Sequence, residues 1–174
     1  DFNRVFANTN TSYNPDTEGR SSGESGADIE RILAFHSLGL ADPVEYQTTW
    51  DEVLKNALEV EMKHKDEEYR QRLTEEQYSV TRQSGTELAF TGLYLDEKRG
   101  GDYFCICCGH LLFTSEMKFD SGCGWPSFHT EHPDAGIRHI EDLSRGRQRI
   151  EVQCTKCDAH LGHIFEDGPQ AFGG

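Results

Sequence analysis

Apolar positions recur at helical spacing only in the first half of this 174-residue chain. Within residues 28–38, Ile29, Ile32 and Leu33 fall on one face of a helix, and Gly39 follows as a stop signal. The pattern therefore predicts an amphipathic helix over residues 28–38.

A longer apolar stripe follows a capping box in which Thr49 is the N-cap and Glu52 stands three residues later. The stripe is made of Trp50, Val53, Leu54, Ala57, Leu58 and Met62. The polar run KHKDEEYRQR continues it as a solvated face, so we expect one helix that ends near Arg72. The stripe packs on the chain's own domain or docks on another protein, which would give residues 1–72 a protein partner.

A second capping box, formed by Thr74 and Gln77, predicts a short helix over the stretch TEEQYSVTR. From Gly85 onward, glycines and aromatic residues become frequent and the helical periodicity fades. The segments DYFCIC, RHIEDL and RQRIEVQC are typical of strands, and SRG at 144–146 predicts a hairpin turn between the last two. We therefore expect a strand-rich second half after a helical extension over residues 28–72.

Composition and charge narrow the function classes. Residues 1–27 are rich in Asn, Thr, Ser, Gly and acids without periodicity, which predicts a flexible arm that is disordered or tethers a partner. The chain has 31 acidic residues against 17 Lys and Arg, a formal net charge of −14. Because such a surface repels phosphate backbones, we expect no nucleic-acid partner. No apolar run approaches the roughly 20 residues of a membrane helix, so we expect no membrane span.

The cysteines predict a metal site. Six are present, all in the second half: Cys105, Cys107, Cys108, Cys123, Cys154 and Cys157. Cys105 and Cys108 form one CxxC pair, Cys154 and Cys157 form another, and each two-residue spacer lets both thiolates reach one ion. Four thiolates would complete the tetrahedral shell of a structural zinc ion that clips two distant hairpins together. The alternative is that the pairs are redox dithiols or free cysteines. Because the cysteines are expected to be reduced, we expect the protein in a reducing compartment, the cytosol or the mitochondrion.

Cys107 adds a second choice of ligands, because the stretch CICC also permits ligation through Cys105 and Cys107. Gly109, directly after Cys108, permits the tight turn that a thiolate knuckle needs. This spacing favours Cys108 as the ligand and leaves Cys107 as a packed small hydrophobe.

A second group of residues suits a reaction rather than a metal. Cys123 stands between glycines in FDSGCGWPSF, which favours an exposed thiol, and Trp125 is either a flat apolar wall beside it or an ordinary core tryptophan. His160 and His163 in HLGHIF suit proton transfer near neutral pH. Their alternatives are hydrogen bonds within the core or ligation of zinc, although the cysteines already fill four positions.

These motifs together resemble the B-type methionine sulfoxide reductases. The stretches LTEEQYSVTRQSGTELAFTG, FDSGCGWPSF and DLSRGRQRIEVQCTKCDAHLGHIFEDGP carry the resemblance with the two CxxC pairs, from about residue 73 to the end. The resemblance implies a mainly β domain of antiparallel sheets over 73–174, clipped by zinc. It also implies the reduction of methionine-R-sulfoxide, free or within proteins, through a sulfenic acid and a disulfide that a thioredoxin-like reductant opens.

The resemblance assigns a role to each candidate residue. Trp125 resembles the aromatic wall for the substrate's methyl group, and Cys123 resembles the resolving cysteine. His160 and His163 resemble the histidines that bind and protonate the sulfoxide oxygen. The zinc ligands of the family correspond to Cys105, Cys108, Cys154 and Cys157.

One element of the family pattern is missing from these residues. The family's nucleophile lies in an Arg-aromatic-Cys-x-Asn stretch after the second histidine, at a spacing that falls just past Gly174. With Asp1 rather than Met at the start, we expect a chain cropped at both ends whose activity needs a cysteine beyond Gly174. The alternatives are a non-catalytic zinc-bound domain serving as a structural or interaction subunit of a larger assembly, and a nucleophilic role for Cys123. Ala89, where the family usually has proline, does not touch the mechanism.

Overall fold

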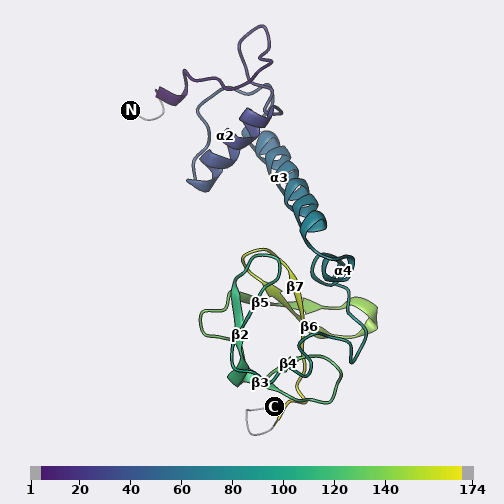
Figure 1. Ribbon diagram of the computed structural model, residues 1–174. Helices are drawn as coiled ribbons and strands as arrows, with labels where there is room; N and C mark the ends of the chain where they lie inside the picture. The colour runs from purple at the N-terminus through teal and green to yellow at the C-terminus, as the bar shows by residue number, and fades with distance from the viewer. Residues whose placement is uncertain (1–4, 170–174) are drawn as a thin grey trace. The chain divides into compact units, whose positions relative to one another are not determined.

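The structure is a computed structural model that describes residues 5–169, apart from the Arg145 side chain. It divides into two compact units, an N-terminal unit, Asp1–Glu68, and a C-terminal unit, Tyr69–Gly174. Each unit has its own cluster of buried apolar side chains, and Figure 1 labels the elements of both. Among the helices of residues 5–169, none is long and apolar enough to cross a membrane.

Helix α2, Gly26–Ser37, confirms the helix predicted over residues 28–38. A capping box fixes its start, because Ser25 Oγ accepts from the Asp28 N–H at 3.2 Å while the Asp28 carboxylate accepts from the Ser25 N–H at 3.4 Å. Asp28 is almost fully buried and also accepts from the Thr11 hydroxyl. The cap therefore joins α2 to the loop that precedes it.

Helix α3, Trp50–Arg72, confirms the second predicted helix to its last residue. Val53 and Ala57 from the predicted stripe are buried together with Ile32 of α2 and form the core of the N-terminal unit. Met62 lies further along the same stripe but is 62% exposed. The core of this unit therefore uses only the first part of the apolar stripe.

Both predicted capping boxes are confirmed. The Glu52 N–H donates to Thr49 Oγ1 at 3.4 Å at the start of α3. The Gln77 N–H donates to Thr74 Oγ1 at 3.2 Å at the start of helix α4, Glu75–Gln83. These caps form because each hydroxyl meets a backbone N–H of the first turn that has no partner within the helix.

The described part of the C-terminal unit has three small antiparallel sheets. Their strands are β1 (Asp102–Phe104), β2 (Leu111–Thr114), β3 (Lys118–Phe119), β4 (Ser127–Phe128), β5 (Ile137–Asp142), β6 (Arg149–Cys154) and β7 (His160–Ile164). The pairs are β1-β2, β3-β4 and the three-stranded sheet β5-β6-β7. The sheets are antiparallel as expected, but most strands are short, so the fold is a mixture of helices and small sheets.

The predicted strands are found with one shortening. β5 and β6 pair from Ile137↔Cys154 to Asp142↔Arg149, and the predicted turn at 144–146 joins them as a short 3₁₀ helix. The segment DYFCIC, in contrast, is a strand only over Asp102–Phe104. The chain leaves the strand there because the next residues turn into the first cysteine knuckle.

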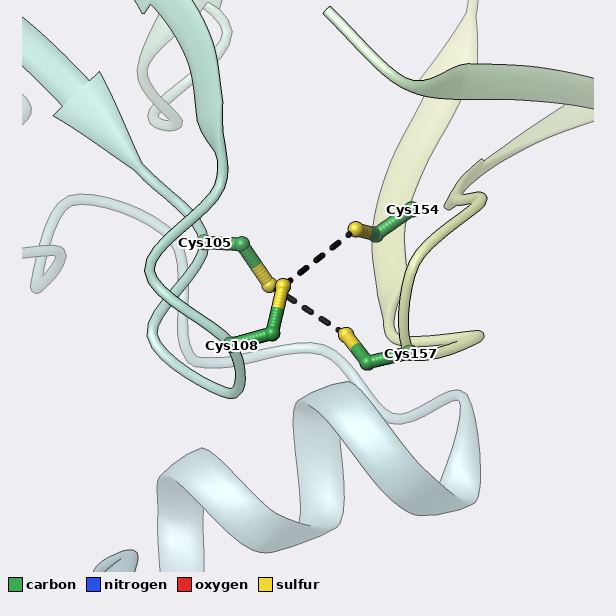
Figure 2. A group of neighbouring side chains, drawn as sticks. All are labelled: Cys105, Cys108, Cys154 and Cys157. Atoms are coloured by element: carbon green, nitrogen blue, oxygen red, sulfur yellow. Dashed lines mark hydrogen bonds between the residues drawn. The ribbon is translucent and has the colours of Figure 1, made fainter. Parts of the chain in front are cut away.

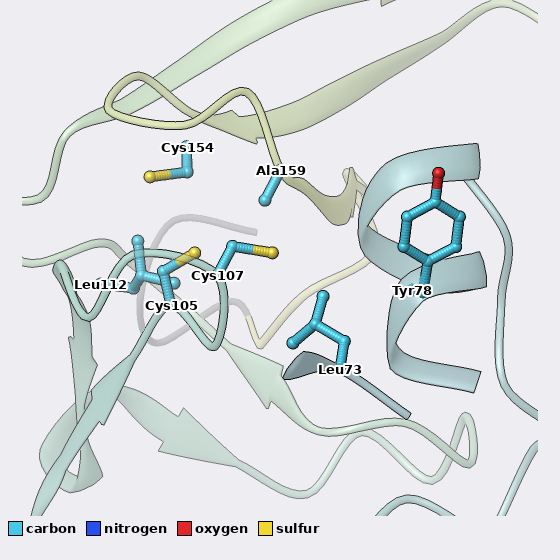
Figure 3. Close-up of a cluster of buried hydrophobic side chains, with 7 residues drawn as sticks. All are labelled: Leu73, Tyr78, Cys105, Cys107, Leu112, Cys154 and Ala159. Atoms are coloured by element: carbon cyan, nitrogen blue, oxygen red, sulfur yellow. The ribbon is translucent and has the colours of Figure 1, made fainter. Parts of the chain in front are cut away.

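The core of the C-terminal unit is built largely around sulfur (Figure 3). Its buried members come from α4, from the segment before it, from the two cysteine turns and from β2. They are Leu73, Tyr78, Cys105, Cys107, Leu112, Cys154 and Ala159. Only Leu73, Tyr78 and Leu112 are large apolar side chains, so the apolar part of this core is small.

Candidate active site and metal centre

The first CxxC pair lies in a tight turn between β1 and β2. The Cys105 carbonyl accepts from the Gly109 N–H at 2.7 Å, and the Cys105 N–H donates to the His110 carbonyl at 2.8 Å. Gly109 has a φ of +70°, a left-handed conformation that glycine adopts without steric cost. The predicted knuckle glycine is therefore at the position where the turn requires it.

The second CxxC pair repeats this backbone pattern between β6 and β7. The Cys154 carbonyl accepts from the Asp158 N–H at 2.8 Å, and the Cys154 N–H donates to the Ala159 carbonyl at 3.0 Å. Asp158 takes the position of the glycine, with a φ of +59°. Aspartate tolerates this left-handed conformation better than most residues, so a non-glycine knuckle is feasible here.

The two turns bring four sulfur atoms together, as Figure 2 shows. The Sγ atoms of Cys105 and Cys157 are 3.6 Å apart, those of Cys108 and Cys154 are 3.7 Å apart, and all four lie within 4.8 Å of one another. With a Zn–S bond of about 2.3 Å, the edge of a tetrahedral thiolate shell is about 3.8 Å. The four thiols therefore have the spacing of a closed tetrahedral metal site.

The surroundings of this cluster favour the neutral form of its thiols. A hydrogen bond with Cys107, together with burial, raises the pKa of the Cys105 thiol to about 12. Burial likewise raises the pKa values of the Cys154 and Cys157 thiols. A divalent ion reverses this balance, because a coordinating thiol is deprotonated outright. The residues thus fit a metal of the zinc type, which prefers four thiolates in tetrahedral geometry.

Cys107 lies outside the four-sulfur group. Its side chain is 2% exposed and belongs to the buried core of the C-terminal unit. This placement favours ligation through Cys108 over the alternative through Cys107, and it agrees with the expected role of Cys107 as a small hydrophobe.

Two arginines support the cysteine turns from α3 and α4, and sequence reasoning missed both. Arg72 donates to the carbonyl of Cys107, and Arg82 donates to the carbonyl of Cys157 at 2.6 Å. The guanidinium groups of Arg72 and Arg82 lie over the ring of Tyr69, at 5.5 and 4.8 Å from its centroid. These contacts tie the helices to each turn, and only long-range packing could reveal them.

Cys123 is exposed in the loop between β3 and β4 and lies among hydroxyl groups. Ser121 Oγ donates to Cys123 Sγ at 2.9 Å, and Ser127 Oγ is 3.6 Å from the same sulfur. Although burial opposes the effect, hydrogen bonds from Ser121 and Ser127 lower the pKa of the Cys123 thiol. The thiol is accessible and is biased toward the reactive thiolate.

Trp125 is half-buried beside this loop and is oriented by a backbone contact. Its indole Nε1–H donates to the Glu87 carbonyl at 3.2 Å. The Phe90 N–H donates to the Gly124 carbonyl at 2.7 Å, which holds the segment around Ala89 against the loop. The indole therefore has a fixed position beside Cys123 rather than a place in the central core.

His160 and His163 share one face of β7 although they stand three residues apart. Gln153 pairs with His160 and Glu151 pairs with His163, so Leu161 is an extra residue on β7, a β-bulge. Paired residues of antiparallel strands point to the same face, and the bulge therefore brings both imidazoles together, with ring centroids 5.3 Å apart. Gly162 follows Leu161 with a φ of +145°, a backbone conformation that residues other than glycine rarely adopt.

Each histidine is paired with a carboxylate that sequence reasoning did not identify. His160 Nδ1 is 2.5 Å from Glu151 Oε1, and His163 Nε2 is 2.8 Å from Asp142 Oδ2. Asp142 also accepts from Arg149 at 2.7 Å. No local signal marks these partners, because they lie on β5 and β6 and meet the histidines only through strand pairing.

The carboxylates are stabilised as anions. Hydrogen bonds from Ser144 and His163, together with the charge of Arg149, hold the pKa of Asp142 well below its usual range. Burial raises the pKa of Glu151, but hydrogen bonds from Gln153 and His160 outweigh it and the pKa is lowered. Both groups therefore keep their charge at neutral pH.

The candidate residues form three separate groups in the described structure. Four cysteines meet at the metal site, Cys123 lies with Trp125 in one loop, and the two histidines lie together on β7. Across residues 5–169, the hydrogen bonds, ion pairs and ring contacts include none that joins either histidine to Cys123 or Trp125. The geometry thus establishes the groups themselves and leaves their joint action as a proposal.

Comparisons with known proteins agree on one family. A family model of the SelR domain matches residues 73–174. The peptide methionine sulfoxide reductase MsrB of Hahella chejuensis is 56% identical over 112 residues, which are 64% of this chain and 81% of that protein. The protein of the same name from Escherichia coli K12 is 54% identical over 107 residues, 62% of this chain and 78% of that protein.

The residues matched by the family model include all three groups of candidate residues. The SelR domain spans both cysteine turns, the Cys123 loop and the histidine strand, so all three groups belong to the part of the chain that the family shares. The resemblance seen in the motifs is thereby confirmed. The chain belongs to the SelR family, the B-type methionine sulfoxide reductases.

Proposed function

We propose that this protein reduces methionine-R-sulfoxide, free or within proteins, to methionine. One observation carries the proposal: within a SelR domain, two imidazoles lie side by side on one face of β7, each hydrogen-bonded to a carboxylate. Such a pair suits protonation of a sulfoxide oxygen near neutral pH. Relatives of this chain carry the name peptide methionine sulfoxide reductase, which agrees with the proposal.

The chemistry begins with attack of a cysteine thiolate on the sulfoxide sulfur. Oxygen passes from the substrate to the attacking sulfur, so the sulfoxide becomes a thioether and the cysteine becomes a sulfenic acid. In the family pattern this cysteine lies in an Arg-aromatic-Cys-x-Asn stretch, which residues 1–174 do not contain. The residues of this chain then supply binding, proton transfer and resolution.

Cys123 is the resolving thiol in this proposal. Its sulfur condenses with the sulfenic acid to form a disulfide and water, and a thioredoxin-like dithiol reduces that disulfide by exchange. Exposure of Cys123 and the lowered pKa of its thiol suit both steps, since the thiolate is the reacting form. Trp125 provides an apolar wall for the methyl group next to the sulfoxide, a contact that sulfur groups favour.

The metal in this proposal is zinc in a structural role. Cys105, Cys108, Cys154 and Cys157 would hold it, and all four positions would be filled by thiolates. The bound ion supplies cohesion between the two cysteine turns and takes no part in the reaction. Because these thiols and Cys123 must stay reduced, we place the protein in a reducing compartment, the cytosol or the mitochondrion.

The proposal is tested with zinc-loaded protein expressed from the complete coding sequence. The substrates are the R and S sulfoxides of free and N-acetylated methionine, with dithiothreitol or thioredoxin as reductant. We expect turnover of the R sulfoxides alone, and a loss of about 10²-fold or more when His160 or His163 is replaced by alanine.

His139 provides the matched control, because it lies on β5 of the same sheet but pairs with Glu131 near the surface. His139→Ala is expected to keep full activity. An intact, zinc-bound protein without turnover on any R sulfoxide would overturn the proposal and favour the non-catalytic zinc-bound domain instead.

A further inference from the structure

The two histidines bind their carboxylates through different ring nitrogens. His160 uses Nδ1 toward Glu151, whereas His163 uses Nε2 toward Asp142. A neutral imidazole carries one ring hydrogen, and the nitrogen that faces a carboxylate is the one that donates it. The opposite nitrogens, Nε2 of His160 and Nδ1 of His163, are therefore left for another partner.

We propose that Glu151 and Asp142 are positioning residues that hold His160 and His163 in opposite tautomers, so that Nε2 of one and Nδ1 of the other face the substrate oxygen. This inference rests on the proposed function and deepens the role of the two histidines. Without the carboxylates, each imidazole is free to exchange tautomers and to rotate.

Burial makes both pairs strong. The His160 and Glu151 side chains are 5% and 14% exposed, and those of His163 and Asp142 are 15% and 16% exposed. Away from water, a charge-assisted hydrogen bond is stronger, and a carboxylate without its partner is costly. The ring nitrogens toward Glu151 and Asp142 are therefore held protonated.

The carboxylates are themselves held in place. Asp142 Oδ1 accepts from the Ser144 N–H at 2.8 Å, while Oδ2 accepts from Arg149 at 2.7 Å. Glu151 is central on β6, paired with Ile140 on one side and His163 on the other. Asp142 therefore cannot turn away from His163 without breaking contacts of its own, and the backbone of Glu151 is fixed by strand pairing on both sides.

The consequence for the reaction is a directed proton transfer. When an imidazolium gives its proton, an N–H bond breaks at the outer nitrogen and an O–H bond forms on the sulfoxide oxygen. The inner nitrogen keeps its hydrogen, which stays hydrogen-bonded to the ionised carboxylate, as in the histidine–aspartate pair of a Ser-His-Asp triad.

Nuclear magnetic resonance of the full chain labelled with ¹⁵N-histidine tests the inference directly. Long-range ¹H–¹⁵N correlation at alkaline pH distinguishes the two tautomers of each neutral ring. We expect His160 in the Nδ1–H form and His163 in the Nε2–H form. Spectra that show the reverse assignment, or both forms in equal amounts, would overturn the inference without any substitution.

Substitutions then assign each tautomer to its carboxylate. Glu151→Gln is expected to change the ¹⁵N signals of His160 and to leave those of His163 unchanged. Asp142→Asn is expected to change the signals of His163 and to leave those of His160 unchanged. The control is Glu141→Gln, which removes the same charge from β5 at an exposed residue that contacts Gln148. A tautomer spectrum that is identical in wild type and Glu151→Gln would contradict the inference.

Turnover separates this inference from the proposed function. In active protein, Glu151→Gln and Asp142→Asn should lower kcat for R sulfoxides by about tenfold or more, with a smaller change in KM, because they impair a general acid. Equal losses in the Glu141→Gln control would contradict a specific role. If the protein reduces no sulfoxide at all, the proposed function fails while the tautomer spectra still decide the inference.

Discussion

The two units of this chain stabilise small cores by different means. The N-terminal unit buries Ile32, Val53 and Ala57 and adds an ion pair, in which Arg31 Nε lies 2.5 Å from Asp42 Oδ2. The C-terminal unit fills much of its core with thiols that fit a metal ion. Both units have a limited apolar core: the ion pair of the first depends on both of its partners, whereas the zinc proposed for the second would have to be delivered by the cell.

The ion pair between Arg31 and Asp42 makes further contacts with several segments of the N-terminal unit. The Asp42 side chain is fully buried and also accepts from the Tyr46 hydroxyl at 2.8 Å. Arg31 donates further to Thr9 Oγ1 and to the Phe6 carbonyl, and its guanidinium lies near the Phe6 ring. A single pair thus connects α2 with segments before and after it.

The largest expected difference between the units follows from metal removal. A thiolate zinc site contributes roughly 10–16 kcal/mol to folding, so a chelator or Cys154→Ser should unfold the C-terminal unit. Hydrogen exchange should rise over β5, β6 and β7 and stay slow over α2. Cys123→Ser, which removes an exposed thiol outside the cluster, is the control and should leave hydrogen exchange unchanged in both units. Retained protection of β6 after complete chelation would contradict the comparison.

The ion pair provides the reciprocal experiment. Asp42→Asn or Arg31→Met leaves one buried charge without its partner and should destabilise the N-terminal unit by about 3–5 kcal/mol. Hydrogen exchange should now rise over α2 and remain unchanged over β6, and the metal content should stay the same. The double variant Arg31→Met with Asp42→Leu should recover much of the loss, because it leaves no buried charge.

The helix caps sharpen the comparison at smaller energies. Thr74→Ala removes the cap of α4 and should cost about 1 kcal/mol of stability in the C-terminal unit. Ser25→Ala at α2 should cost more, up to about 2 kcal/mol, because the Ser25 side chain also hydrogen-bonds the buried Asp28 carboxylate. Thermal unfolding of both variants measures the two costs, and equal costs would show that burial of Asp28 adds nothing.

Acid should affect the N-terminal unit through Asp28. Burial raises the pKa of Asp28, but hydrogen bonds from Ser21, Ser25 and Ser12 outweigh it, and the pKa is lowered. A carboxyl whose pKa is lower in the folded state stabilises the fold above its unfolded value of about 3.9, and this contribution is lost as pH falls through the folded pKa. Asp28→Asn should therefore flatten the stability of α2 below about pH 4, measured by circular dichroism.

Local signals explain what the sequence could predict. The boxes at Thr49 and Thr74 act within one helical turn, and each CxxC spacer brings two sulfurs together without help from distant residues. The four clustered cysteines and the helix starts could therefore be predicted from short stretches. The exposed thiol expected for Cys123 was readable from its flanking glycines for the same reason.

Long-range pairing explains what the sequence could not predict. Arg82 meets the Cys157 carbonyl across 75 positions of chain, and Asp142 meets His163 across 21. Asp158 adopts a positive φ in the second turn, at the position that Gly109 occupies in the first, and no rule of spacing indicates that an aspartate will do so. These contacts depend on which strands become neighbours, which periodicity alone does not determine.

The bulge at Leu161 means that the histidine pair is encoded by a count of residues. Alternation along a strand has parity, and an odd interval separates two side chains onto opposite faces unless one residue is skipped. Without the bulge, regular pairing over an interval of three would turn one imidazole to the other side of the sheet, whereas deleting Leu161 would shorten the interval to two and keep both imidazoles on one face. The interval of three residues between His160 and His163 therefore requires the bulge if both imidazoles are to lie on one face of the sheet.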